Sequence, residues 1–308
     1  MKILVTGGTG MLGTAFRKIK TNHDLLLVGS KDFNLTDSRS ALSMIRSCEP
    51  DAIIHLAAKV GGIKSNLDNM ADFYTDNVLI NTNVLDAAHK LKIKKVLSLM
   101  STCVYPDKAL LPLKESSLHL GPPHPSNFGY AYAKRMLDVQ SRAYRKQHGC
   151  NFITAIPNNL FGEDDNFDLR NSHVIPAIIR KVYEAKKKKE DVLLWGDGSP
   201  LREFTYSRDL AHTLMFVLEN YNDSPPINVG NTSEYSIEDI ALMISRIISF
   251  EGNIMWDTTM PNGQLRKPSD NSKLIGLGWN ADSYTNIYNS LKKTCEWFIN
   301  NYPSVRGI

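Results

Sequence analysis

The chain has few cysteines, and their placement excludes several kinds of site. Among its 308 residues only Cys48, Cys103, Cys150 and Cys295 are cysteines, and no two of them have the C-x-x-C spacing. The sequence therefore gives no indication of a structural zinc site or a redox dithiol, and we predict no metal. Free thiols persist in a reducing compartment, so we expect a cytoplasmic protein.

Long apolar runs and a strong charge excess are also missing. No run reaches the roughly 18 apolar residues that a membrane-spanning helix needs. The strand expected over residues 2–6 opens the chain, which leaves no room for a signal peptide. The formal net charge is +4, which suits an anionic small molecule but is too small to indicate a nucleic-acid partner. We therefore expect neither a membrane nor a nucleic acid among its partners.

The chain does have the composition of an ordinary globular domain, with 42% hydrophobic residues. Short, almost uninterrupted apolar runs alternate with longer helical patterns, as in parallel sheets covered on both faces. The expected strands are residues 3–5, 25–28, 52–56, 96–100 and 152–156, and the expected helices are 11–19, 38–46, 67–91 and 130–147. This alternation predicts an α/β fold with a Rossmann-type, doubly wound parallel sheet.

The second half has a looser rhythm. We expect a helix over 173–188, a strand over 192–195, and helices over 207–219, 236–249 and 283–300. These elements predict a smaller α/β substrate-binding domain over the carboxyl ends of the sheet, where ligands bind in such folds. The expected division is 1–162 for the NADP-binding domain and 163–308 mainly for the substrate domain, with segments near 203–230 returning to the Rossmann domain.

A glycine-rich loop follows the first strand and precedes a helix. Gly7, Gly10 and Gly13 stand three residues apart. Glycines allow a tight turn and a close backbone approach, and the helix start offers free N–H groups to a pyrophosphate. The expected nucleotide contacts in this loop are Gly7, Gly8, Thr9, Gly10, Met11, Leu12 and Gly13.

The tip of the second strand bears on the choice of nicotinamide cofactor. An NAD site usually has an acid at this tip, whereas here Ser30 and Lys31 offer a hydroxyl and an ammonium group that suit a 2′-phosphate. Asp32 follows directly and makes the distinction less sharp. We predict NADP(H) as the cofactor.

Other cofactor contacts are expected at the ends of the next strands. Asp37 is read either as lying near the adenine or as the N-cap of the following helix. Small side chains after the third strand would let the cofactor lie close, although tight packing explains them equally well. These further candidates are Leu56, Ala57, Ala58, Leu99 and Met100.

Ser101, Tyr130 and Lys134 form a candidate catalytic set. Tyr130 and Lys134 are four residues apart, so they share one face of a helix. A neighbouring ammonium group lowers the pKa of a phenol, which lets it exchange a proton near neutral pH. Ser101, at the end of a strand, can hold the substrate oxygen.

On these motifs the sequence resembles the extended short-chain dehydrogenase/reductases, and within them the enzymes that epimerise and reduce GDP-4-keto-6-deoxy-mannose. The resemblance covers essentially the whole chain and is carried by residues 101–106, 127–135, 157–162, 172–176 and 195–204. It implies a GDP-sugar substrate, epimerisation at C3 and C5, and reduction at C4 by hydride from NADPH and a proton from Tyr130. It also implies a homodimer formed through the helices over 67–91 and 130–147.

The resemblance assigns further roles. It makes Cys103 and His173 the two groups that remove and return a proton during epimerisation; without it they would be read as an inert thiol and a helix-start histidine. It places Pro157, Asn159 and Leu160 near the nicotinamide, and Lys181, Trp195, Arg202 and Asn262 near the GDP-sugar. Arg202 has a second interpretation, as a surface ion-pair partner of Glu203 or Asp209.

Other activities stay open on the sequence alone. A related enzyme of the colitose or deoxyheptose type has nearly the same motifs, since Cys103 and His173 can serve one epimerisation, two or none. A 4,6-dehydratase is disfavoured because neither Thr102 nor Cys103 is a carboxylate. A non-catalytic NADP-binding sensor would not need Tyr130 and Lys134.

Overall fold

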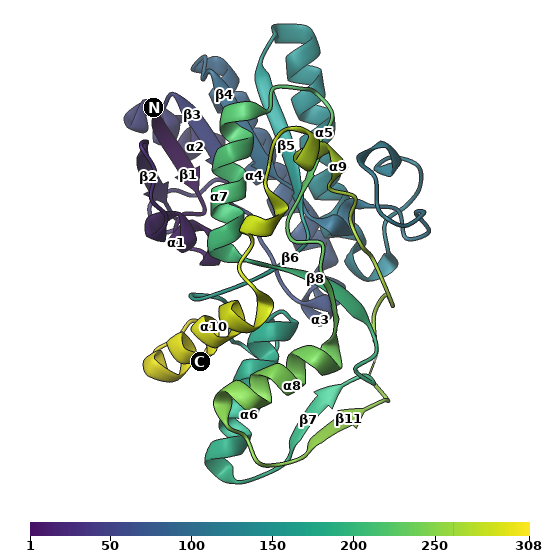
Figure 1. Ribbon diagram of the computed structural model, residues 1–308. Coiled ribbons are helices and arrows are strands. Elements are labelled where there is room, and N and C mark those ends of the chain that lie inside the picture. Colours follow the sequence, from purple (N-terminus) through teal and green to yellow (C-terminus); the bar gives the residue numbers. More distant parts are fainter. Residues whose placement is uncertain (261) are drawn as a thin grey trace.

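The computed structural model describes residues 1–260 and 262–308, and a six-stranded parallel sheet forms its larger part (Figure 1). The strand order is β2-β1-β3-β4-β5-β9. The strands are β1 (Lys2–Thr6), β2 (Asp24–Val28), β3 (Ala52–His55), β4 (Lys95–Leu99), β5 (Asn151–Pro157) and β9 (Ile227–Val229). The chain leaves β1 toward β2 and later returns to its other side with β3, so the crevice of a doubly wound sheet opens at the carboxyl ends of β1 and β3.

Helices cover both faces of this sheet. Alternate side chains of β1 point to opposite faces: Ile3 and Val5 pack with Phe16 and Leu214, whereas Leu4 packs with a second cluster behind the sheet. The first face holds α1 (Met11–Lys18) and α7 (Ser207–Asn220), and the second holds α2 (Ser38–Cys48), α4 (Met70–Lys90) and α5 (Phe128–His148). In Figure 1, α7 lies in front of the sheet.

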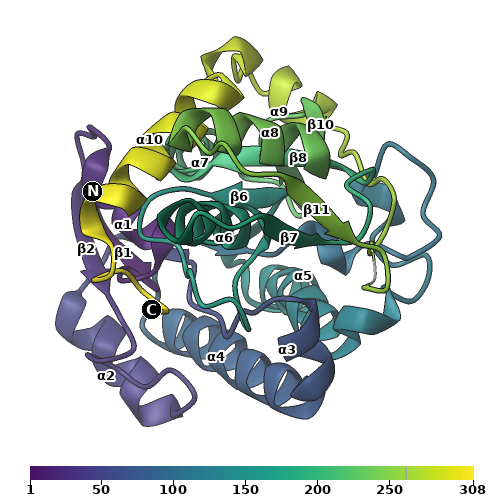
Figure 2. The ribbon, with the colours of Figure 1, turned by 90° about the horizontal axis from the view of Figure 1, so that it is seen from below.

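A smaller part lies beneath the carboxyl ends of the strands, and Figure 2 looks onto it from below. Its apolar core is shared by three helices that contact one another: α6 (Val174–Lys188), α8 (Ile237–Ile248) and α10 (Ile287–Asn301). Two small sheets complete it, in the orders β10-β8-β6 and β11-β7. Their strands are β6 (Asn159–Phe161), β7 (Val192–Trp195), β8 (Leu201–Tyr206), β10 (Glu234–Ser236) and β11 (Ile254–Asp257).

The predicted fold class is confirmed, with differences at particular elements. The helix expected over 67–91 is two helices, α3 (Ile63–Asp68) and α4, because Asn69 leaves the helical conformation and its side-chain amide bonds to the Ser65 carbonyl. The last helix begins at Ile287 rather than 283, since Asn286 caps it. A short helix, α9 (Ser272–Gly276), was not expected.

The position of the later elements bears on the domain division. α7 packs on α1, and β9 pairs with β5 in the large sheet. The boundary at residue 162 stays a prediction. No helix within the described residues is long and apolar enough to cross a membrane.

Candidate active site

The glycine-rich loop brings β1, α1 and the end of β3 into close contact. Gly7 has a φ of +73°, a conformation that favours glycine. A Cβ added at Gly13 would lie 2.4 Å from the Gly7 carbonyl oxygen, so only glycine fits where α1 crosses the loop. Gly10 precedes α1 and supplies no side-chain cap, which leaves the N–H groups of the first turn available to an anion.

The loop after β2 presents Ser30 and Lys31 as exposed side chains. Asp32 instead faces its own turn, where its Oδ2 accepts a hydrogen bond from the Gly29 N–H at 2.8 Å. The carboxylate that could have served ribose hydroxyls is therefore engaged with the backbone. This arrangement favours a phosphate-bearing nucleotide at the β2 tip.

Asp37 is the N-cap of α2. Its Oδ1 accepts a hydrogen bond from the Ser40 N–H at 2.8 Å. Of the two interpretations of this residue, the structure contains the cap, and the contact with adenine stays a prediction.

The remaining predicted cofactor residues lie at the carboxyl ends of the central strands. The Ala57 N–H donates to the Thr6 hydroxyl at 3.3 Å, and a Cβ on Gly7 would be 2.9 Å from the same nitrogen, so tight packing accounts for the small residues of segment 56–58. The amide of Asn159 donates to the Glu203 carbonyl at 2.8 Å. Met100 and Pro157 are buried and Leu160 is partly buried. Their contacts with the cofactor stay predictions.

A buried polar chain that sequence reasoning missed connects the nucleotide loop with α5. The Thr6 hydroxyl lies 2.8 Å from His55 Nδ1, and His55 Nε2 lies 3.2 Å from Asn81 Oδ1. The Asn81 amide then donates to the Ala133 carbonyl at 3.2 Å, beside Lys134. Burial, and then the Lys134 charge, lowers the pKa of His55 to about 3, so His55 is a neutral member of this chain.

Tyr130 and Lys134 both lie on α5 and face the end of β4. Lys134 is only 2% exposed, and its Nζ donates to the Leu99 carbonyl at 2.8 Å. Burial lowers the pKa of Lys134 to about 8. Burial also raises the pKa of Tyr130, and the neighbouring Cys103 raises it further. The phenol is thus protonated, as a proton donor must be.

This finding corrects one expectation about the pair. The ammonium of Lys134 was expected to lower the pKa of Tyr130, but within the described residues it bonds to Leu99 and not to the phenol. Desolvation is the largest cause of both shifts, and neither group is among the causes of the other's shift.

Ser101 and Cys103 belong to the turn that follows β4. Ser101 precedes a short 3-10 helix, Thr102–Val104, which carries the partly buried Cys103. Arg135 fixes this turn to α5, since its Nε donates to the Val104 carbonyl at 2.5 Å. Ser101, Cys103, Tyr130 and Lys134 therefore meet where β4 ends.

Burial sets the resting state of the Cys103 thiol. It raises the pKa of Cys103, whereas the Ser101 hydroxyl, then Lys267 and then Lys134 lower it. The net direction is upward, so the thiol carries its proton in the free protein.

His173 approaches the same region from the start of α6, where it is the N-cap residue. The His173 side chain is exposed to solvent on one side. Desolvation by the protein around it nevertheless lowers its pKa, and the Lys267 charge lowers it further. Lys267 thus acts on both Cys103 and His173. Sequence reasoning missed this lysine, because it belongs to no recognisable motif and only the fold brings it to the site.

Lys181 and Trp195 form one edge of the smaller part. The Lys181 Nζ lies 5.5 Å from the centre of the Trp195 ring and donates to the Leu193 carbonyl at 2.9 Å. The Trp195 side chain remains 48% exposed. Asn262 lies near the end of β7, where its Oδ1 accepts from the Asp197 N–H at 2.9 Å. Their contact with substrate stays a prediction.

Arg202 forms no ion pair within the described residues. Its Nη1 donates to its neighbour's carbonyl, that of Leu201, at 2.7 Å. Glu203 is held by Ser269, and Asp209 is held by Thr285. The interpretation of Arg202 as an ion-pair partner of either acid is therefore wrong, and its charge is available to an anion.

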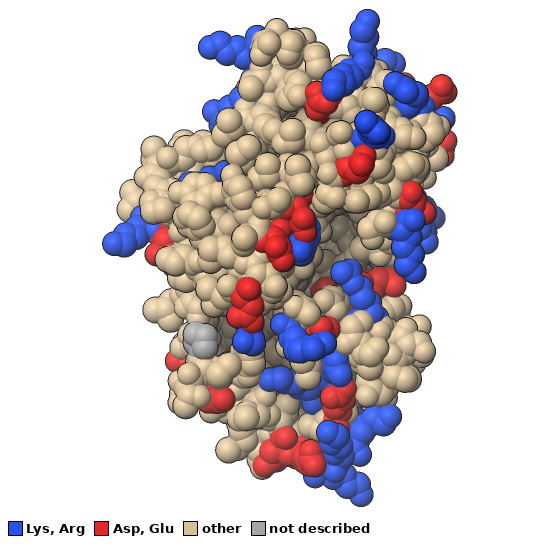
Figure 3. Space-filling view, turned by 180° about the vertical axis from the view of Figure 1, so that it is seen from behind, with Lys and Arg blue, Asp and Glu red and all other residues tan. Residues whose placement is uncertain are grey.

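The surface between the two parts is hollowed. Figure 3 shows Lys and Arg side chains gathered along the lower side of this hollow. Such a distribution attracts an anionic ligand.

The glycine loop, the parallel sheet and the Tyr130–Lys134 helix together define a nucleotide-dependent oxidoreductase of the extended short-chain dehydrogenase/reductase type. The chain belongs to the NAD dependent epimerase/dehydratase family, which its residues 3–230 match, and within that family to the GDP-L-fucose synthases.

Two similar proteins support this placement, and a third is named for a different GDP-sugar. The chain is 41% identical to GDP-L-fucose synthase of Dictyostelium discoideum, over 99% of this chain and 97% of the other. The crystal structure of a GDP-L-fucose synthetase from Naegleria fowleri bound to NADP has a TM-score of 0.94 and 39% identity, covering 99% of this chain and 94% of that one. GDP-L-colitose synthase of Yersinia pseudotuberculosis is 36% identical, over 97% of this chain and 98% of the other.

Proposed function

We propose that the protein converts GDP-4-keto-6-deoxy-D-mannose to GDP-L-fucose with NADPH, by epimerisation at C3 and C5 and reduction at C4. The observation that carries this proposal is the proximity of Cys103 to Tyr130 at the end of β4, where the Cys103 charge raises the pKa of Tyr130. A thiol that can take a carbon-bound proton and a phenol that can donate a proton to a ketone oxygen would thereby act on the same substrate.

The residues at the crevice fit NADP(H). The first turn of α1 lacks a side-chain cap, the β2 tip offers Ser30 and Lys31, and the Asp32 carboxylate is engaged with Gly29. NADPH, when bound, supplies the hydride for C4. The protein's part in reduction is to deliver the Tyr130 proton to the C4 oxygen, with the Lys134 charge close to the phenolate that remains.

Epimerisation uses the acidity of the C–H bonds beside the keto group. Cys103, as a thiolate, takes a proton from C3 or C5, so an S–H bond forms, the C–H bond breaks and its electron pair moves into the C4 carbonyl to give an enolate. His173 returns a proton to the opposite face of the carbon. Two groups on opposite sides are what inversion requires.

The GDP portion would lie against the smaller part. The Arg202 guanidinium donates from Nη1 to the Leu201 and Leu265 carbonyls but forms no ion pair within the described residues. Its charge and its other N–H groups suit a diphosphate. Lys181 and the exposed ring of Trp195 lie on the same part and offer a charge and a flat apolar surface.

The proposal is tested by following NADPH oxidation with GDP-4-keto-6-deoxy-D-mannose and identifying the product by NMR. We expect GDP-L-fucose, with solvent deuterium at C3 and C5 when the reaction runs in D2O. Tyr130→Phe should abolish oxidation but keep NADPH binding, and Cys103→Ser should stop deuterium incorporation. Normal turnover by Tyr130→Phe would contradict the assignment of the proton donor.

A second candidate function is favoured by the similarity to GDP-L-colitose synthase. An enzyme of that type would act on a related GDP-keto-deoxysugar. It is distinguished by NADPH oxidation with that substrate and none with GDP-4-keto-6-deoxy-D-mannose.

We also propose that the protein is a homodimer formed through α4 and α5, as the family resemblance implies. These helices pack side by side, and apolar side chains on them stay exposed, with Leu79 at 40%, Tyr74 at 42% and Val139 at 52%. A second copy of the same pair would cover them as a four-helix bundle. Light scattering should give twice the chain mass, and Val139→Asp should give a monomer.

The family's chemistry and the four free thiols support a cytoplasmic location. Fractionation of the source cells tests it, and recovery in a secreted or membrane fraction would contradict it.

A further inference from the structure

The segment 262–271, which we call the strap, runs from β11 to α9 and crosses the site. Its backbone is fixed on both sides of Lys267. The Leu201 N–H donates to the Leu265 carbonyl at 2.9 Å, and the Leu113 N–H donates to the Pro268 carbonyl at 2.7 Å. Next to these, the buried Glu203 carboxylate accepts from the Ser269 N–H at 2.9 Å. The position of Lys267 is thus set by the fold.

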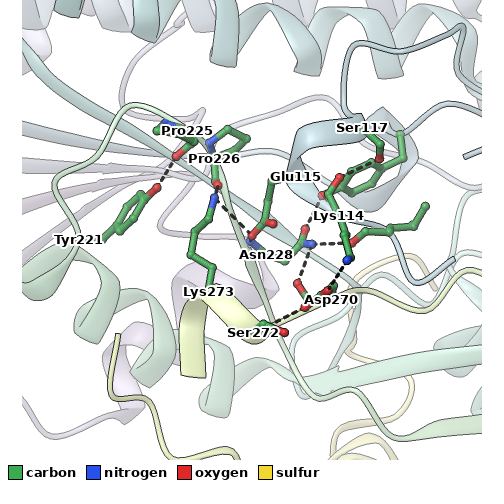
Figure 4. A network of polar contacts seen from close by, with 12 residues as sticks. Lys114, Glu115, Ser117, Tyr221, Pro225, Pro226, Asn228, Asp270, Ser272 and Lys273 are labelled. Atoms are coloured by element: carbon green, nitrogen blue, oxygen red, sulfur yellow. Dashed lines mark hydrogen bonds and ion pairs between the residues drawn. The ribbon is translucent and has the colours of Figure 1, made fainter. Parts of the chain in front are cut away.

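A single buried amide connects the strap with the turn that carries Cys103. Asn228, at the centre of β9, donates from Nδ2 to the carbonyls of Leu113 at 2.9 Å and Asp270 at 3.1 Å (Figure 4). Its Oδ1 accepts from the Tyr105 hydroxyl at 2.6 Å. Tyr105 lies two residues after Cys103, so the same side chain anchors both segments.

Lys267 and Cys103 line the same cavity of about 80 Å³, together with Thr102, His124 and Asn127. The lysine charge is near enough to lower the pKa of Cys103 and that of His173. The Lys267 side chain is itself mostly surrounded by protein, and burial lowers its pKa to about 8.

The other cations near Cys103 have partners. Lys134 bonds to the Leu99 carbonyl, and Arg135 bonds to the carbonyls of Val104 and Gly121. Arg266, the neighbour of Lys267, is paired with Glu234. Within the described part of the chain, Lys267 has neither a hydrogen bond nor an ion pair. The Arg202 charge lowers the pKa of Lys267, whereas the Cys103 and Glu203 charges raise it, so a Cys103 thiolate would stabilise this ammonium group.

We propose that Lys267 is a positioning residue for epimerisation, whose ammonium group is the counter-ion of the Cys103 thiolate. The thiol releases its proton to water, and the sulfur that remains pairs with the Lys267 charge across their shared cavity. Cys103 is then able to take the proton from the sugar carbon. This inference rests on the proposed function only for what the thiolate does afterwards.

The groups that face Cys103 determine how its ionisation depends on pH. From α5 these are Tyr130, Lys134 and Arg135, and from the strap they are Lys267 and Arg266. His124 and Asp107 line the cavity from the loop after β4. Burial, and then the Lys267 charge, lowers the pKa of His173, whereas the negative charge of a bound diphosphate acts on His173 in the opposite direction.

The test measures thiolate formation without substrate. Purified protein is treated with iodoacetamide from pH 6 to 10, and the alkylation rate of the Cys103 peptide is followed by mass spectrometry. Removal of a nearby positive charge in Lys267→Met should move the midpoint upward by about one pH unit. The rate at pH 7 should fall about tenfold. Lys267→Arg should keep the wild-type profile. Lys292→Met is the matched control with no change expected, because it removes an exposed ammonium group on α10 that pairs with Glu296.

Activity separates this inference from the proposed function. Lys267→Met should slow deuterium incorporation into the sugar more than it raises the KM for the GDP-sugar. An unchanged alkylation profile with a raised KM would overturn the inference and make Lys267 a diphosphate ligand. A shifted profile in a protein that incorporates no deuterium even as wild type would support the inference and refute the proposed epimerisation.

Discussion

Replacing Gly13 by alanine should damage the protein at the point where α1 crosses the nucleotide loop. The new Cβ would lie 2.4 Å from the Gly7 carbonyl oxygen and 2.5 Å from the Gly8 carbonyl carbon and Cα. All three are backbone atoms of a tight loop, so no side-chain rotation can relieve the clash. The loop and the start of α1 must move apart, which also misplaces the N–H groups that face a pyrophosphate.

The size of the effect follows from two opposing terms. Overpacking of this kind costs about 1–3 kcal/mol, and the better helix propensity of alanine returns up to about 1 kcal/mol. We therefore expect a net loss of roughly 1–2 kcal/mol. Because the unfolding entropy of 308 residues is about 0.65 kcal/mol per kelvin, Tm should fall by about 1.5–3 °C. NADPH affinity, measured by calorimetry, should fall at least about tenfold if the misplaced N–H groups cost about 1.4 kcal/mol of binding.

Gly276→Ala is the matched control. It makes the same chemical change in α9, where an added Cβ meets nothing within 4 Å. Its Tm should equal or exceed that of the wild type, with unchanged NADPH affinity. A Gly13→Ala variant as stable as this control, and binding NADPH as tightly as the wild type, would refute the close-packing argument for the loop.

Two further predictions concern carboxylates. Asp37→Ala removes the cap on the Ser40 N–H and should lower the free energy of unfolding by about 1 kcal/mol, which a lower Tm would show. NADPH affinity should stay the same. A large loss of NADPH affinity would place Asp37 at the adenine. Burial raises the pKa of Asp165 to about 7, above the unfolded value, so the contribution of this carboxyl group to the stability of the wild type falls as pH rises from 4 to 7. Since Asp165→Asn cannot ionise, urea unfolding should show it gaining stability over the wild type across this range, by up to about 4 kcal/mol; a constant difference would contradict the reasoning.

The features that the sequence predicts well are those with local physical causes. The spacing of Gly7, Gly10 and Gly13 predicts a tight turn between a strand and a helix. The apolar runs predict buried parallel strands. The spacing of Tyr130 and Lys134 puts them on one helical face without knowledge of the fold. Five of the six strands of the main sheet, and the placement of Tyr130 and Lys134 on one helix, could therefore be predicted.

The features that were missed depend on contacts between distant segments. β6, β9 and β10 have three residues each, too few for a periodic pattern, and they become strands only by pairing with neighbours. The bond from Asn81 to the Ala133 carbonyl and the approach of Lys267 to Cys103 are set by packing. No local pattern distinguishes Lys267 from the chain's other lysines, because its role depends on the hydrogen bonds that position the strap.

The hydrogen bonds of Asn228 give a reason why part of the second half of the chain returns to the large sheet. β9 adds a sixth strand beside β5, and its central residue Asn228 is fully buried. From there Asn228 holds Tyr105 and Asp270, the first close to Cys103 and the second close to Lys267. A rigid strand thus fixes the spacing between a thiol and its cation, which a loop alone would not hold as closely. The return of the chain to the sheet contributes to chemistry as well as to the core.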